Sequence, residues 1–365
     1  MEFKHSEERQ MLIDMLARYL QNDYPLQARN IAAESDAGFS DAQWRSFCDL
    51  GIAGAFFDED QGGFGGSAFD IVAVFEQLGR ALVVEPLLDC GLLPGQLFAA
   101  AGETGHLADV IGGVRRFAVA LPEGDKTACH ATRTDLGWTL TGTCAQVSFA
   151  TATDAVLVTA RTGAEAADMT LFLVPVDAPG LSLVRFGTFD GGSVADLGFE
   201  GVQLGDDHRI GPAHGAAPLV ANARAWGTVA ICAEALGIME TIKAMTLDYL
   251  RTRSQFGTTI GRFQALQHGM AQVLLEIEQA RSAVINAAAA MDQPEEQRDR
   301  MISAAKYTVG RIGTLVTEES IQLHGGIGMT WEYELGHFAK RLMMIDHSFG
   351  DMDHHLARFM ALRAS

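Results

Sequence analysis

The chain has 365 residues, of which 48% are hydrophobic and 20% are charged, so it is long enough for two or three packed units of an ordinary globular protein. Its formal net charge of −19 repels polyanions, which argues against binding to nucleic acid or to an anionic membrane surface. The first residues are charged, the five cysteines stand far apart, and no uninterrupted apolar run reaches the roughly 20 residues of a membrane span. We therefore expect a cytoplasmic protein with reduced thiols.

The first third of the sequence has the spacing of amphipathic helices. A helix is predicted after Ser6, because two acidic residues open it and apolar residues then recur every four positions. Another is predicted after Ser40, whose spacing to Gln43 matches a capping box, and a third after Ser67. The glycine-rich stretch 58–66 lacks the Lys-Ser/Thr pair of a phosphate-binding loop, so we expect a plain loop there.

Short β-type runs separated by turn formers follow from about residue 113 to residue 212. The predicted strands are Phe117–Leu121, Trp138–Leu140, Ala155–Ala160, Thr170–Val174, Leu181–Phe186 and Ala195–Leu204. Six strands at this spacing favour a small sandwich or barrel.

The remainder of the chain is predicted to be helical. After Pro218 the only further proline is Pro294, and apolar residues at helical spacing predict long helices, the last beginning near Leu335. The sequence therefore predicts an α+β, mainly α, chain with three domains. These domains are an N-terminal helical domain over 1–112, a middle β domain over 113–212 and a C-terminal four-helix bundle over 213–365.

Two glycine-containing motifs stand in the predicted bundle. The first reads Arg253-Ser254-Gln255-Phe256-Gly257 and is followed by Phe263-Gln264. Arg253 can grip a pyrophosphate, and Phe256 offers a flat face to an adenine. Gln264 carries both donors and acceptors for the polar edges of a nucleotide. The same pattern also fits a helix that ends at Gly257 and carries a surface arginine.

The second motif reads Gln322-Leu323-His324-Gly325-Gly326-Ile327-Gly328. Gln322 can hydrogen-bond a nucleotide, and Gly325 and Gly326 let backbone N–H groups approach a ligand. A glycine-rich turn between two helices would give the same pattern.

Together with the order of the predicted domains, these motifs resemble the acyl-CoA dehydrogenase family along the whole chain. The resemblance implies an acyl-CoA substrate, an FAD cofactor and an electron-transfer flavoprotein as electron acceptor. It further implies a role for seven residues in holding the adenosine and pyrophosphate end of an FAD whose flavin ring lies in the neighbouring subunit. These residues are Arg253, Gln255, Phe256, Gln264, Gln322, Gly325 and Gly326.

The segments that hold the flavin ring in this family differ here. Where the β domain begins, the family's Thr-Glu-Pro and Ser-Asp pattern is replaced by Ala120-Leu121-Pro122-Glu123-Gly124-Asp125. The next segment, which carries a tryptophan in the family, reads Gln146-Val147-Ser148. The resemblance therefore implies a chain that keeps the adenine side of the FAD site and has lost much of the flavin-ring side.

The glutamate that removes the α-proton of the substrate is also missing from both places where the family carries it. The usual place here reads Phe349-Gly350-Asp351, with Gly350 at the glutamate position, and the other place aligns with Gly227. Asp351 is the nearest carboxylate and thus the candidate base. A metal site made by Asp351, His354 and His355 is disfavoured, because no further ligand cluster accompanies them.

The string Phe-Gly-Asp-x-Asp-His-His at 349–355 resembles the small subunits of two-gene acyl-CoA dehydrogenases that act on pimeloyl-CoA or on steroid side-chain CoA thioesters. The leading hypothesis is thus a small subunit in an α2β2 assembly with a larger subunit that carries the base, in lipid or steroid degradation. One alternative is a self-sufficient homo-oligomer that uses Asp351. Another is a structural partner without FAD contact.

Overall fold

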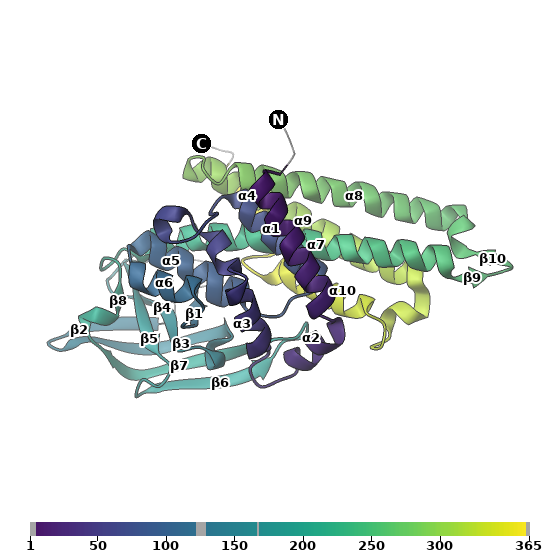
Figure 1. Ribbon diagram of the computed structural model, residues 1–365. Helices are drawn as coiled ribbons and strands as arrows, with labels where there is room; N and C mark the ends of the chain where they lie inside the picture. Colours follow the sequence, from purple (N-terminus) through teal and green to yellow (C-terminus); the bar gives the residue numbers. More distant parts are fainter. Residues whose placement is uncertain (1–4, 122–128, 166–167, 363–365) are drawn as a thin grey trace. The chain divides into compact units, whose positions relative to one another are not determined.

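The computed structural model describes residues 5–121, 129–165 and 168–362 (Figure 1). The chain divides into two compact units. The helical unit comprises residues 1–28, 68–83 and 228–365, and the sheet unit comprises residues 29–67 and 84–227. The boundaries of the three predicted domains stay a prediction. The two compact units are defined by contacts within each unit, whereas the predicted domains were defined by changes between helix and strand.

The order of elements is helices, then strands, then helices, which confirms the predicted α+β, mainly α, organisation. The first helices are α1 (Glu7–Asp23), α2 (Leu26–Ala33), α3 (Asp41–Asp49), α4 (Ala68–Arg80), α5 (Leu93–Ala101) and α6 (Thr104–Ile111). The later helices are α7 (Ala216–Thr252), α8 (Gln264–Ala289), α9 (Glu295–His324), α10 (Leu335–His347) and α11 (Met352–Ala361). The predicted last helix is thus two helices, α10 and α11.

Side-chain caps fix where the first helices begin. The Ser6 hydroxyl accepts a hydrogen bond from the Arg9 amide at 3.2 Å, and α1 starts at the predicted place. The Ser40 hydroxyl likewise accepts from the Gln43 amide at 3.3 Å. The reciprocal half of the predicted capping box is not formed, because the Ser40 amide donates to the Glu85 carboxylate instead.

The glycine-rich stretch 58–66 folds against its own neighbours. The amide of Phe64 donates to the carbonyl of Gly54 at 3.0 Å, and that of Gly65 donates to the carbonyl of Phe57 at 2.9 Å. A Cβ on Gly65 would collide with the Ala55 carbonyl, so this glycine allows a close backbone approach. The stretch is therefore a packed loop, as predicted.

The strands form one sheet in the order β6-β7-β3-β2-β4-β5-β8, and β1 pairs with β4. Their bounds are β1 (Phe117–Ala120), β2 (Cys129–Thr134), β3 (Gly137–Ser148), β4 (Ala155–Arg161), β5 (Met169–Pro175), β6 (Leu181–Gly187), β7 (Ser193–Leu204) and β8 (Arg209–Ile210). The six predicted runs correspond to β1 and β3 to β7. The prediction missed β2 because its buried positions are small residues that alternate with polar ones.

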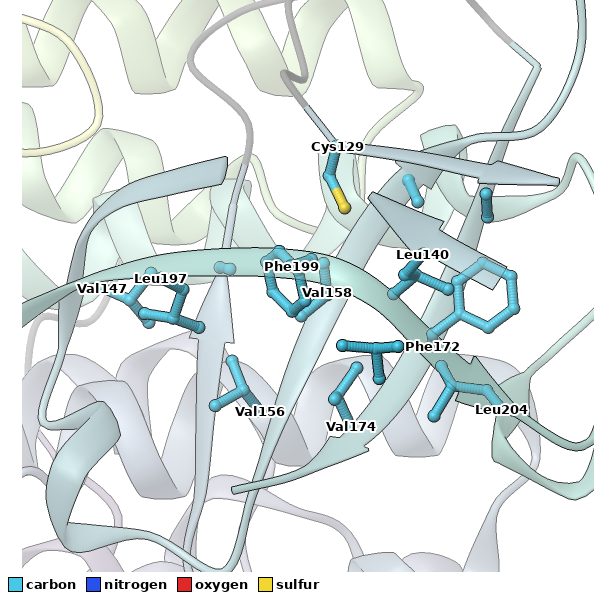
Figure 2. Close-up of a cluster of buried hydrophobic side chains, with 14 of the residues drawn as sticks. Cys129, Leu140, Val147, Val156, Val158, Phe172, Val174, Leu197, Phe199 and Leu204 are labelled. Atoms are coloured by element: carbon cyan, nitrogen blue, oxygen red, sulfur yellow. The ribbon is translucent and has the colours of Figure 1, made fainter. Parts of the chain in front are cut away.

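One hydrophobic core is shared by two parts of this sheet, β6-β7-β3-β2 and β4-β5-β8 with β1 (Figure 2). β2 and β4 meet in parallel at one pair, His130 and Arg161. β2 runs antiparallel to β3, and β4 runs antiparallel to β5 and parallel to β1. Leu140 and Phe199 from one part share the core with Val158 and Phe172 from the other. Each such buried side chain stabilises the fold by roughly 1.5–3 kcal/mol. The predicted sandwich or barrel is thus realised as one continuous sheet folded about a shared core.

Two glycines bring α4 and α7 into backbone contact in the helical unit. A Cβ on Gly79 would collide with the carbonyl oxygen of Glu234, and one on Gly237 would collide with that of Glu76. An alanine at either position would therefore push the two helices apart.

Ion pairs connect α4, α7 and α8 beside this contact. Glu76 contacts Arg80 at 2.7 Å and Arg281 at 3.4 Å, and Glu240 contacts Arg281 at 2.9 Å and Lys243 at 2.5 Å. Burial raises the pKa of Glu240, but Lys243 and the two arginines outweigh it and lower that pKa overall. The network keeps the carboxylates charged where the helices meet.

Within the described residues, α7 is the one helix long and apolar enough to cross a membrane. Its most apolar 18-residue window has a mean hydropathy of 1.3, and 89% of that window is buried inside the protein. Such burial is typical of the core helix of a helical domain.

Candidate functional site

The first motif forms a hairpin directly after α7. The strands β9 (Ser254–Gln255) and β10 (Thr258–Thr259) pair antiparallel, and Phe256 and Gly257 form the tip at φ +54° and +78°. The alternative of a helix ending at Gly257 is therefore wrong, because α7 ends at Thr252. A bulky side chain in left-handed backbone costs about 1–3 kcal/mol and is typical of functional sites.

The hairpin holds its charged and aromatic side chains out from the protein. The Arg253 amide donates to the Tyr249 carbonyl, and the Arg253 carbonyl accepts from the Ile260 amide, both at 2.9 Å. The Arg253 guanidinium is exposed and makes no ion pair with the residues that the structure describes. Phe256 is 92% exposed, and Phe263 meets it edge-on at 6.2 Å.

The chain after the hairpin is tied back to the end of α7. The side-chain amide of Gln267 donates to the Gly261 carbonyl at 2.9 Å. A Cβ on Gly261 would lie 2.7 Å from the carbonyl oxygen of Leu250, so this segment packs closely on α7. Gln264 is the first residue of α8 and is exposed, as is Gln255 in β9.

The second motif ends α9 and leaves open space at its glycines. Gly325 has φ +67° and ψ −148°, a combination open essentially only to glycine. A Cβ on Gly325 or on Gly326 would meet nothing within 4 Å. Packing of this chain therefore does not demand a glycine at 326, and the space beside it remains free for a ligand. Gln322 is exposed on the last turn of α9.

An aromatic cluster brings the two motifs together. The rings of Tyr249 and His324 stack at 4.5 Å, and Tyr333 lies 5.2 Å from His324. Tyr249 precedes Arg253 by one helical turn, and His324 directly precedes Gly325. The His324 Nδ1–H donates to the Ser320 carbonyl at 2.8 Å, and burial lowers the pKa of His324. Both motifs therefore lie at the same end of the helical unit.

The turn between α10 and α11 has no room for a side chain at position 350. Phe349 and Gly350 have φ of +59° and +102°. A Cβ on Gly350 would lie 2.5 Å from Cδ2 of His354. Asp351 is the N-cap of α11, because its carboxylate accepts from the His354 amide at 2.8 Å. This hydrogen bond lowers the pKa of Asp351, which makes it a weaker base.

Two buried groups anchor the same turn: Lys306, which the sequence analysis missed, and His355, which it considered only as a metal ligand. Lys306 of α9 is fully buried, and its Nζ donates to the carbonyls of Asp346 at 2.7 Å and Gly350 at 2.8 Å. His355 donates from Nε2 to the Phe349 carbonyl at 3.1 Å, and burial lowers its pKa to about 3. Lys306 stands at helical spacing from apolar residues of α9, and this signal could have identified it.

Comparison with known proteins identifies the family. Residues 6–102 match the model of the acyl-CoA dehydrogenase N-terminal domain, and residues 218–359 match that of the C-terminal domain. The acyl-CoA dehydrogenase IpdE2 of Mycolicibacterium smegmatis is 30% identical over 92% of each chain. The chain belongs to the acyl-CoA dehydrogenase family. Membership confirms the predicted fold and makes FAD its cofactor and FAD-dependent dehydrogenation the activity of its family.

One further relative and two solved structures are similar to this chain. FadE27 of Mycobacterium tuberculosis is 28% identical over 86% of each chain. The ChsE4-ChsE5 complex from the same organism superposes with a TM-score of 0.90 at 26% identity, covering 100% of this chain and 99% of that one. A variant of the steroid acyl-CoA dehydrogenase Tcur3481-Tcur3483 gives 0.87 at 28% identity and 98% coverage of both chains.

The residues at the hairpin and the glycine turn fit the adenosine and pyrophosphate end of FAD. The Arg253 guanidinium suits the pyrophosphate, the exposed Phe256 ring suits the adenine, and the space at Gly326 admits the close approach of a ligand.

The resemblance assigns residues 120–125 and 146–148 to the flavin-ring side of the site. Residues 122–125 lie outside the described residues. Gln146 has φ +54° and donates from its amide to the Asp196 carboxylate at 2.8 Å, and Ser148 ends β3. Gly227, which the resemblance aligns with the family's second position for a base, is buried within α7. In the part of the chain that the structure describes, no three His, Cys, Asp or Glu side chains group as metal ligands.

Proposed function

We propose that this chain is a subunit of an FAD-dependent acyl-CoA dehydrogenase that contributes the adenosine and pyrophosphate half of the FAD site to a larger subunit. The larger subunit supplies the glutamate base and the flavin-ring contacts, and the two assemble as α2β2. The observation that carries this proposal is the turn at Gly350, where a positive φ and the His354 ring leave no room for a glutamate side chain.

Each residue of the site has a defined part in this proposal. Bound FAD supplies the acceptor for the hydride that leaves the β-carbon of the acyl-CoA. Arg253 holds the pyrophosphate by charge-assisted hydrogen bonds, and Phe256 covers the adenine. The open backbone at Gly325 and Gly326 lets N–H groups approach the dinucleotide. Gln255, Gln264 and Gln322 offer side-chain amides around it.

The names of the similar structures support a two-chain assembly. Two of them are described by a pair of different chains, and one is described as a steroid enzyme. We propose a larger acyl-CoA dehydrogenase as the partner, a CoA thioester of steroid or similar lipid origin as the substrate and an electron-transfer flavoprotein as the acceptor. A cytoplasmic location remains the expectation.

The two alternatives have less support. A homo-oligomer that uses Asp351 needs a basic, mobile carboxylate, whereas this carboxylate caps α11 and has a lowered pKa. A structural partner without FAD contact would not explain why Arg253 is exposed and why the space at Gly326 is open.

Replacing Arg253 tests the role of this half-site. The Arg253→Ala complex, purified with its partner, should bind FAD about 10- to 100-fold more weakly, since a hydrogen bond to a charged group contributes ~1.5–3 kcal/mol. The measurement is flavin absorbance per protein during titration with FAD. Arg18→Ala, which alters an exposed arginine on α1, is the matched control and should bind FAD normally. Full occupancy of the Arg253→Ala complex at low FAD would remove Arg253 from the site.

A further inference from the structure

Two cysteines that are far apart in the sequence meet in the sheet unit. Cys129 opens β2 and pairs with Gly142 of β3, and Cys144 lies two residues further along β3 on the same face. This register makes the two side chains diagonal neighbours on one face, and Cys144 is the largest influence on the pKa of Cys129. Cys129 is fully buried, with its sulfur directed toward the core (Figure 2). Cys144 is partly exposed and packs against the same core.

The contact makes the two thiols chemically unequal. Cys144 and burial raise the pKa of Cys129 and keep it a thiol. Cys129 in turn lowers the pKa of Cys144, although the partial burial of Cys144 acts in the opposite direction. The thiolate is the reactive form of cysteine, and a partly exposed thiol with a lowered pKa beside a buried thiol is the arrangement of a nucleophile with a resolving partner.

The other three cysteines differ from this pair. Burial raises the pKa of Cys48 to about 11 and that of Cys232 to about 12, and it also raises the pKa of Cys90. No second thiol acts on any of them. Cys90 and Cys232 are buried and Cys48 is partly exposed, and the raised pKa makes each a less reactive thiol than Cys144.

We propose that Cys129 and Cys144 form a dithiol site that hydrogen peroxide converts reversibly into an intrachain disulfide. The Cys144 sulfur attacks one peroxide oxygen, the O–O bond breaks, and the leaving hydroxide takes a proton to become water. The resulting sulfenic acid is then attacked by the Cys129 sulfur. The S–O bond breaks as the S–S bond forms, and the hydroxide leaves as water with the Cys129 proton. Two thiols are oxidised and one peroxide is reduced to two waters.

The local backbone allows this end of the strand pair to close. Diagonal neighbours on antiparallel strands stand about 7–8 Å apart at Cα, just above the usual range for a disulfide. The pairing of β3 with β7 is irregular immediately after Cys144. Cys144 thus lies beside a register shift, where a small backbone movement meets little resistance.

Peptide mapping tests the proposal on the full-length chain, in whatever complex it is purified. After peroxide treatment and alkylation of remaining thiols, trypsin cleaves at Lys126, Arg133 and Arg161. Cys129 then lies in peptide 127–133 and Cys144 in peptide 134–161. We expect these two peptides to be joined, two hydrogens lighter than their sum, with two of the five thiols lost and both restored by dithiothreitol.

Single substitutions separate the two roles. Cys144→Ser should abolish the linked peptide, whereas Cys129→Ser should leave a sulfenic acid at Cys144 that a cyclic 1,3-dione traps. Cys232→Ser is the matched control and should form the linked peptide as the parent protein does. Retention of all five thiols in the parent protein, or a linkage to any other cysteine, would overturn the proposal. The map of the parent protein decides this even if a serine variant fails to fold.

Discussion

The imidazole of His354 stands where a side chain on residue 350 would have to go. A Cβ on Gly350 would lie 2.5 Å from Cδ2 and 3.2 Å from Nε2 of that ring. The backbone of Gly350, at φ +102°, also disfavours any residue with a Cβ. A side chain at position 350, which the resemblance aligns with the family's glutamate base, would therefore meet both an unfavourable backbone conformation and the exposed ring of His354.

Gly350→Glu should therefore destabilise the chain without making it active on its own. The left-handed backbone alone costs about 1–3 kcal/mol, and displacement of His354 adds to it. Thermal unfolding and acyl-CoA-dependent flavin reduction measure the two effects. Gly105→Glu is the control, because a Cβ there meets nothing within 4 Å. A stable Gly350→Glu chain that reduces flavin without a partner would contradict this account.

Asp351→Asn should leave turnover of the complete complex within about twofold of the parent, since asparagine caps helices as well as aspartate does. Asp351→Ala removes the cap of α11 and should lower the melting temperature. Steady-state kinetics with thermal unfolding distinguish a cap from a base. A thousandfold slower flavin reduction in Asp351→Asn, with FAD content intact, would make Asp351 the base and favour the homo-oligomer.

Lys306→Met should destabilise the chain by about 2–4 kcal/mol, because it removes two charge-assisted hydrogen bonds to the turn that carries Gly350. Chemical denaturation measures the loss. Lys243→Met, which removes a partly exposed ion pair with Glu240, is the comparison and should cost at most about 1 kcal/mol. Equal losses in the two variants would show that Lys306 does not anchor the turn.

Stability should fall as pH drops from about 6.5 toward 3, in part because of His355. Its pKa of about 3 in the folded chain lies below the ordinary 6.5, so between these values the unfolded chain binds more protons. One such group contributes up to about 1.4 kcal/mol per pH unit. His355→Phe should flatten the dependence of unfolding free energy on pH by about this amount. His268→Phe, at an exposed histidine, should not.

The sequence predicted helix caps well, because they depend on neighbouring residues. It predicted poorly the contacts between residues that are far apart in the chain. The caps at Ser6 and Ser40 bond amides three residues further along the chain, so the local sequence pattern indicates them. β2 and the meeting of Cys129 with Cys144 depend on the register between strands, which no local pattern specifies. The role of Lys306 depends likewise on a turn forty residues away in the chain.

The same contrast between local patterns and distant contacts holds for the candidate site. Both motifs were recognisable from residue types, but their meeting through Tyr249 and His324 required the fold. The sequence also placed Gly350 at the glutamate position, whereas only the structure shows the ring of His354 beside it. The roles of the seven residues assigned to FAD binding stay predictions, which measurements of FAD affinity in their variants test.

The flavin content of this chain, alone and with its partner, tests the central claim most directly. Expressed alone, the chain should be nearly colourless or should aggregate, because the segments aligned with the flavin-ring contacts differ from those of the family. Co-expressed with a larger acyl-CoA dehydrogenase subunit, it should give a yellow α2β2 complex with about one FAD per heterodimer. A stable yellow protein from this chain alone, with one FAD per subunit and dehydrogenase activity, would contradict the account.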